Sequence, residues 1–189
     1  NKTVNTNFSW KELAITQNTV AHRFLAAVKL SLYVMKNRIK GEEITLIGHS
    51  HGGNVAIMAA KLLHAVTGEK INLITLATPA YNQKDNPQNP ATIENKKSIN
   101  DQIHIYNTVD KVQTTGASNA GDKNESNRTY TNTSTRNNKI DVSKEYNSTE
   151  FLDAHSFDID HPELIKEKGI QKLVPVPNTN KNENTTPKK

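Results

Sequence analysis

Ser50 is the residue whose neighbours point most clearly to chemistry. It lies in Gly48-His49-Ser50-His51-Gly52, a G-x-S-x-G pattern that follows the apolar residues 44–47 and precedes a helical pattern rich in Ala, Val and Leu. A serine on a tight turn between a buried strand and a helix holds its hydroxyl clear of the sheet, where it can act as a nucleophile. The backbone N–H of His51, at the helix N-terminus, would then face a developing oxyanion. The alternative is a glycine-rich turn with a structural role only.

The glycines around Ser50 are part of the same prediction. Strand and helix backbones come close at such a turn, so the residues two before and two after the serine should carry almost no side chain. Gly48 and Gly52 meet that demand, and Gly53 should ease the start of the helix.

A serine hydroxyl also needs a base, and an imidazole base needs a carboxylate that fixes its tautomer. On a strand–serine–helix turn, the three groups follow in the order Ser, Asp or Glu, then His. Asp110 directly follows the predicted strand 102–109 and is the predicted acid, with a turn-forming Asp as the alternative. Asp101 precedes the same strand and would lie at the wrong edge of the sheet.

Two histidines near the C-terminus compete for the role of base. His155 is preferred, because its small neighbours Ala154 and Ser156 leave room for a substrate. His161 directly precedes Pro162, at the start of a predicted last helix whose dipole would disfavour its protonation. We therefore expect His155 to be the base and keep His161 as the alternative.

Acidic residues surround these two histidines, which raises the question of a metal site. Their spacing lacks the Gly and the terminal Glu of a calcium-binding loop, and the histidines beside Ser50 do not form an H-E-x-x-H zinc pattern. A solvated acidic loop is the simpler interpretation of Asp153, Asp158, Asp160 and Glu163. We expect neither a metal nor another cofactor.

The elements that must position these residues are strands alternating with helices. The almost continuous apolar run 71–77 is typical of a strand covered on both faces, hence of a parallel sheet. Periodicity predicts a helix over 19–39, whose inward residues are Val20, Phe24, Ala27, Val28, Ser31, Leu32, Met35 and Ile39. It predicts a second helix from Ser50 to about Thr67, whose inward residues are Val55, Ala59, Leu62 and Val66. The predicted strands are 3–9, 43–48, 71–77 and 102–109, with a fifth possible near 140–146, and a short last helix begins at Pro162.

With these residues in place, the chain resembles α/β-hydrolases of the lipase/esterase type. GHSHGGNVAI, LATPA, NTVDKVQ and DAHSFDIDHPEL are together similar to lipase-like domains near the C-termini of bacterial Rhs-repeat, polymorphic-toxin-like proteins, over roughly residues 8–170. The resemblance implies an α/β fold of partial α/β-hydrolase type. It also implies cleavage of a lipid-like ester by Ser50, His155 and Asp110, with the His51 amide in the oxyanion hole. Acyl transfer and a catalytically silent scaffold domain are the alternatives.

The predicted strands fall short of the roughly eight in a whole α/β-hydrolase, and no HGGG-like segment precedes Ser50. We therefore expect that the remainder of a longer polypeptide completes the sheet and supplies the second oxyanion donor; the alternative is an incomplete oxyanion hole. The absence of an initiating Met agrees with that expectation. Location is left open between a secreted effector and the cytoplasm.

Composition limits the other possibilities. The 189 residues suit one domain, predicted over residues 1–173 with a polar loop at 114–139, followed by a disordered tail at 174–189. Zero cysteines exclude disulfides and thiolate metal sites. The net charge of +5 is spread out, so a solvated basic surface is the simpler interpretation and peripheral contact with an anionic membrane the alternative. No nucleic-acid motif and no transmembrane segment are found.

Overall fold

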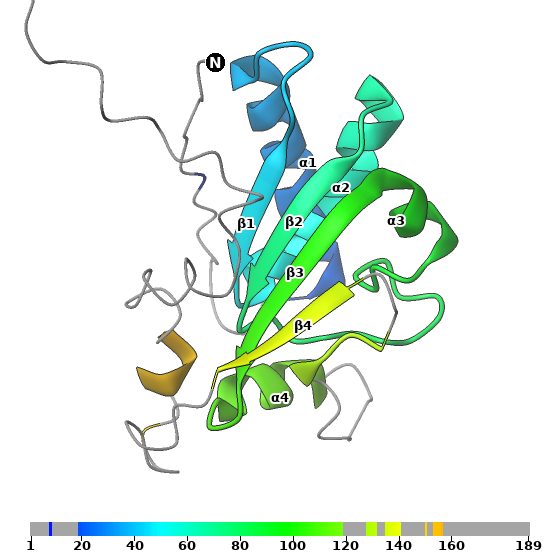
Figure 1. The fold of residues 1–189 in the computed structure, drawn as a ribbon. Helices are drawn as coiled ribbons and strands as arrows, with labels where there is room; N and C mark the ends of the chain where they lie inside the picture. The colour runs from blue at the N-terminus through cyan, green and yellow to red at the C-terminus, as the bar shows by residue number, and fades with distance from the viewer. Residues whose placement is uncertain are drawn as a thin grey trace, which may run out of the picture.

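The structure is a computed structural model that describes Phe8, residues 19–118, 128–131 and 135–140, Glu150 and residues 153–156. Helices and strands alternate along these residues, and a short helical turn lies at 153–156 (Figure 1). The elements are α1 (Val20–Asn37), β1 (Thr45–His49), α2 (His51–Thr67), β2 (Ile71–Leu76), α3 (Ile93–Ser98), β3 (Ile99–Asn107), α4 (Lys111–Ser118) and β4 (Thr135–Ile140).

The four strands form one parallel sheet in the order β1-β2-β3-β4. Every residue of β2 is buried, as its apolar run predicts. The carboxyl ends of parallel strands meet at one edge, so the residues that follow β1, β2 and β3 lie at the same end of the sheet (Figure 1). The α/β fold class with a mostly parallel sheet is therefore confirmed.

The core lies between this sheet and α2, which packs against β1, β2 and α1. The buried residues of α2 are mostly small or aliphatic, and its alanines let this helix approach the strands closely. The left-handed Gly68, with φ 72°, ends α2 as a C-cap. Val66, predicted to face inward, is 72% exposed instead.

The predicted inward face of helix α1 is only partly right, since Ala27 and Ser31 of that face are buried but its large side chains are not. Phe24 and Leu32 are 46% and 67% exposed, whereas Ala27 and Ser31 are buried. The reason is that α1 packs on another helix, and small side chains allow that close contact. The Ser31 hydroxyl donates to the carbonyl of Ala27 at 2.8 Å, within α1 itself.

The predicted loop 114–139 is wrong at both of its ends. Helix α4 continues to Ser118, and β4 begins at Thr135, before the fifth strand that the sequence predicts. Strand β4 pairs with β3 along its whole length. The predicted strand 3–9 (apart from Phe8), the helix from Pro162 and the tail from 174 fall outside the described residues, so the domain boundaries stay a prediction.

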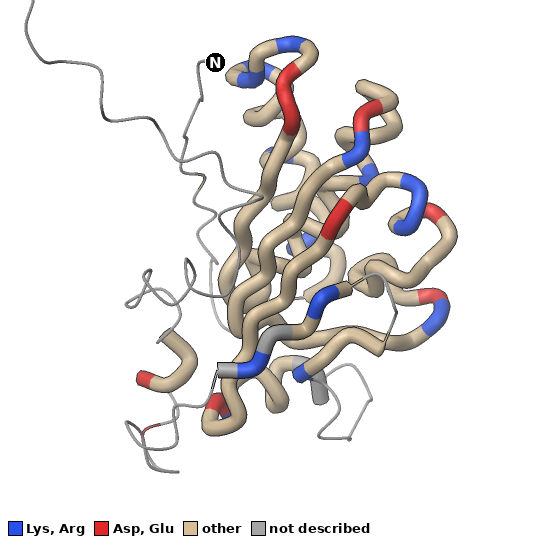
Figure 2. The backbone as a smooth tube through the Cα atoms, in the orientation of Figure 1, with Lys and Arg blue, Asp and Glu red and all other residues tan. Residues whose placement is uncertain are grey.

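Acidic and basic residues alternate along several of the described segments (Figure 2). Figure 2 shows basic and acidic segments side by side in the loop before β1, in the loop before β2 and around α3. Among the described helices, none is both long enough and apolar enough to cross a membrane.

Candidate active site

Ser50 stands on a strained turn between β1 and α2. Its φ is 52° and its ψ is −136°, a backbone conformation that favours glycine. The neighbouring strand holds it there, because the Ser50 N–H donates to the carbonyl of Leu76 at 2.8 Å. The Ser50 carbonyl in turn accepts from the N–H of Gly53 at 3.0 Å. Strain that the surrounding structure maintains in this way is typical of a functional site.

A second strained residue follows the adjacent strand. Ala77 has a φ of 46°, is fully buried, and donates its N–H to the carbonyl of Ile105 at 2.9 Å. Ser50 and Ala77 thus depart from ordinary backbone geometry at the same edge of the sheet. Hydrogen bonds to the next strand over fix both residues.

Gly48 acts as predicted, but Gly52 does not. A Cβ on Gly48 would lie 2.5 Å from the carbonyl oxygen of Gly52, so the strand does need a glycine there. A Cβ on Gly52 would meet nothing within 4 Å, whereas one on Gly53 would lie 2.0 Å from Oγ1 of Thr78. The prediction for Gly52 is wrong, because its backbone, and not its missing side chain, faces Gly48. Gly53 is the position where the helix touches the residues after β2.

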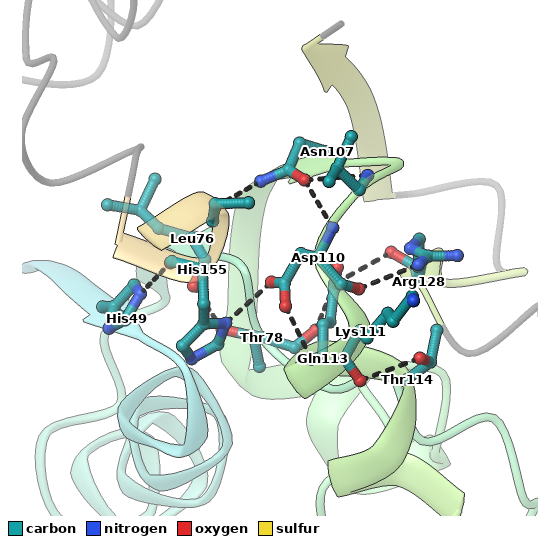
Figure 3. Close-up of polar contacts among 12 residues, drawn as sticks. His49, Leu76, Thr78, Asn107, Asp110, Lys111, Gln113, Thr114, Arg128 and His155 are labelled. Carbon is teal, nitrogen blue, oxygen red and sulfur yellow. Dashed lines mark hydrogen bonds and ion pairs between the residues drawn. The ribbon is translucent and has the colours of Figure 1, made fainter. Parts of the chain in front are cut away.

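Asp110 and His155, predicted as acid and base, are in direct contact (Figure 3). The distance from His155 Nδ1 to Asp110 Oδ2 is 2.7 Å, and the carboxylate is fully buried. A carboxylate can only accept, so Nδ1 carries the proton and Nε2 is free to accept one. The other carboxylate oxygen accepts from the N–H of Gln113 at 2.9 Å, in the first turn of α4, as an N-cap does. His161 lies outside the described residues.

Asn107, the last residue of β3, joins the turn of Asp110 to the turn of His155. Its side-chain nitrogen donates to the carbonyl of Ala154 at 2.7 Å, and its side-chain oxygen accepts from the N–H of Asp110, also at 2.7 Å. The residue is fully buried. Sequence reasoning missed Asn107, whose only signal was its place three residues before the predicted acid.

His49, treated in the sequence only as part of the motif, also contacts the His155 turn. Its Nε2 lies 2.8 Å from the carbonyl oxygen of His155, and the two ring centroids are 4.7 Å apart. Within the described residues the Ser50 hydroxyl makes no hydrogen bond to His155. Catalytic hydrogen bonds are often long without a substrate. In this structure His49, the residue before Ser50, makes the contact between the serine turn and His155.

His51 begins α2, and the first N–H groups of a helix have no acceptor within it. Burial lowers the pKa of the His51 imidazole to about 3, and the nearby Arg23 guanidinium and His155 add to that effect. The His51 side chain is therefore neutral and a poor base at neutral pH. Its backbone N–H is the group that can stabilise an anion.

Two further residues near the site have structural roles. His104 is fully buried: its Nε2–H donates to the carbonyl of Arg128 at 2.7 Å, and the Thr75 hydroxyl donates to Nδ1 at 2.8 Å. His104 is thus a packed sheet histidine, and burial lowers its pKa to about 4. Tyr81 is buried too, with its hydroxyl donating to the carbonyl of Gly116 at 3.0 Å.

No group of three or more His, Asp or Glu side chains suited to a metal is found in the described part of the chain. The arrangement consists instead of a serine on a strained turn and a carboxylate–imidazole pair at the same edge of the sheet.

A parallel sheet with a serine elbow after β1 and an Asp–His pair after β3 defines an α/β-hydrolase type of domain. Residues 21–161 match the family described as the PGAP1-like alpha/beta domain. The chain belongs to this family, which is of the lipase/esterase-type α/β-hydrolase class. The predicted partial α/β-hydrolase fold is thus confirmed. Comparisons with curated proteins and with solved structures gave no match.

Proposed function

We propose that the chain is a serine hydrolase that cleaves carboxylic esters through Ser50, His155 and Asp110. The observation that carries the proposal is the 2.7 Å contact between His155 Nδ1 and the buried Asp110, at the sheet edge where Ser50 stands on its strained turn. Membership of the PGAP1-like family supports a hydrolase of the lipase/esterase type.

In the proposed mechanism, the Ser50 hydroxyl attacks the ester carbonyl while Nε2 of His155 takes its proton. Asp110 holds the imidazole in the required tautomer and stabilises its charged form. The His51 N–H donates to the tetrahedral oxyanion. His155 then gives its proton to the departing alcohol, and water, activated by the same imidazole, releases the acyl group from Ser50.

The substrate and setting rest on the sequence resemblance. We propose a lipid-like ester, a phospholipid where the domain is part of an antibacterial effector of the Rhs-repeat type. The proposal includes peripheral contact with a membrane surface and a longer polypeptide that supplies the second oxyanion donor. It involves neither nucleic acid nor a cofactor.

Labelling with a fluorophosphonate probe, with the modified residue located by mass spectrometry, tests the proposal. The expected adduct lies on Ser50 and disappears in Ser50→Ala and His155→Ala. His161→Ala should keep the adduct, which separates the two candidate bases, and His64→Ala in α2 is a matched control. Asp110→Asn should label at least a hundredfold more slowly, because the wrong imidazole tautomer becomes available.

Short-chain ester hydrolysis by the same variants extends the test. The Ser50→Ala variant should lose turnover, and adding an alcohol acceptor shows whether acyl transfer competes with hydrolysis. A wild-type chain with neither adduct nor turnover, alone or within a longer polypeptide, would refute the proposal and favour a catalytically silent scaffold.

A further inference from the structure

His49 makes two separate contacts with His155 (Figure 3). The first is the hydrogen bond from its ring nitrogen Nε2 to the His155 carbonyl at 2.8 Å. Since a carbonyl only accepts, Nε2 of His49 carries a proton and donates it. The second is the ring contact, with centroids 4.7 Å apart and planes tilted by 51°. One side chain therefore holds both the backbone and the ring of the proposed base.

The helical residues 153–156, which carry His155, are held by side chains at the ends of two strands. Asn107, at the end of β3, binds the carbonyl of Ala154, and His49, at the end of β1, binds the carbonyl of His155. Strand β2 lies between β1 and β3, so the two side chains hold the turn from both sides.

The chain position of His49 gives its contact a further consequence. His49 is the residue before Ser50, and its side chain leaves the last position of β1. Its hydrogen bond therefore links the base to the backbone that carries the nucleophile. Asp110 orients the imidazole through Nδ1, but that bond leaves the distance between the His155 turn and the Ser50 turn free to vary.

We propose that His49 is a positioning residue that holds the His155 imidazole at the distance and orientation needed to accept the Ser50 proton. This inference rests on the proposed function, since it assigns His49 to the same reaction. His49 itself transfers no proton in it.

Two substitutions separate the hydrogen bond from the ring packing. His49→Gln keeps a side-chain N–H donor, and His49→Phe keeps an aromatic ring but cannot donate. We expect His49→Phe to lower kcat for a short-chain ester and the fluorophosphonate labelling rate of Ser50 about tenfold, roughly the worth of one hydrogen bond. KM should stay within about twofold, because the change affects proton transfer and not substrate binding. His49→Gln should recover most of the rate, and His64→Phe serves as the control.

The outcomes distinguish this inference from the proposed function. A wild-type chain that neither labels nor turns over contradicts the proposed function itself. If the wild type is active and His49→Phe is equally active, the proposed role of His49 is wrong. It is also wrong if His49→Phe and His49→Gln lose the same fraction of kcat and of the labelling rate. If the thermal midpoint shows that His49→Phe does not fold, His49→Ala replaces it as the donor-loss variant.

An NMR measurement tests the positioning without any substrate. The Nδ1 proton of His155, bonded to Asp110, should give a downfield imidazole resonance that disappears in His155→Ala. We expect it to stay sharp in His49→Gln and to broaden in His49→Phe, because a released turn lets the imidazole move. An unchanged resonance in His49→Phe would show that His49 does not hold the imidazole, whatever the activity.

Discussion

Replacing Gly53 by alanine should destabilise the serine turn, whereas the same change at Gly52 should not. The new Cβ at position 53 would lie 2.0 Å from Oγ1, 2.7 Å from Cγ2 and 2.9 Å from Cβ of Thr78, which is fully buried. Rotation of the Thr78 side chain can move Oγ1 and Cγ2 but leaves its Cβ in place. Either α2 or the segment after β2 must therefore shift.

The magnitudes follow from these distances. Forcing a methyl group into a packed interior typically costs about 1–3 kcal/mol. A Cβ on Gly52 meets nothing within 4 Å, so Gly52→Ala should instead stabilise by about 0.5–1 kcal/mol, the usual advantage of Ala over Gly in a helix. The free energies of unfolding of the two variants should differ by about 1.5–4 kcal/mol, the sum of the two effects.

Urea unfolding followed by circular dichroism measures this difference. Each kcal/mol also shifts the thermal midpoint of a domain of this size by about 2–4 °C. Thr78→Ala should partly rescue Gly53→Ala in a double-mutant cycle, because it removes the two closest atoms. Equal stabilities of Gly52→Ala and Gly53→Ala would refute the reasoning, and so would a Thr78→Ala change that rescues nothing.

Three further predictions concern strain, protonation and the turn that carries His155. Ser50→Gly should unfold at a thermal midpoint above that of Ser50→Ala, since only glycine relieves the strain of about 1–3 kcal/mol at φ 52°, and neither variant should label. Burial lowers the pKa of His104 from 6.5 to about 4. As the pH falls, the unfolded chain therefore binds a proton at this histidine before the folded protein does. The contribution of His104 to stability in urea should then be fully present well above pH 6.5 and fall by up to ~3 kcal/mol towards pH 4. His51, whose pKa is also lowered, adds to the fall in both proteins, so the difference between the wild-type and the flatter His104→Gln profile measures the His104 part. Asn107→Ala leaves the Ala154 carbonyl and the Asp110 N–H without their partner, so Ser50 labelling should slow at least tenfold; an unchanged rate would contradict the role of that contact.

Short-range patterns explain why so much of the fold and of the candidate site could be predicted. The apolar run of β2 and the glycine at position 48, two residues before Ser50, each act within a few residues. Consecutive parallel strands end at one edge of the sheet, which predicted Ser50 and Asp110 at that edge. The small neighbours of His155 then favoured it over His161 as the partner of Asp110.

Features that depend on distant partners could not be predicted in this way. The inward face of α1 is set by its contact with α2, so small Ala27 is buried and Phe24 is not. The contact of His49 with His155 spans 106 residues of sequence. Strand β4 has the sequence TRNNKI, without an apolar alternation, and it is fixed by pairing with β3 and by the bond from Thr135 Oγ1 to Gln102 Oε1 at 2.9 Å.

The proposed catalytic groups are held in two different ways. Ser50 directly follows β1, and its N–H donates to the carbonyl of Leu76 in β2, so the sheet fixes its backbone. Asp110 lies three residues beyond β3, and its N–H donates to the side chain of Asn107, the last residue of that strand. His155 lies 45 residues beyond Asp110, and its contacts with Asp110, Asn107 (through Ala154) and His49 come from side chains. Side-chain contacts are lost more easily than a parallel sheet unfolds. The position of the imidazole, and not the strained serine, is therefore where single substitutions should change the rate most without changing the fold.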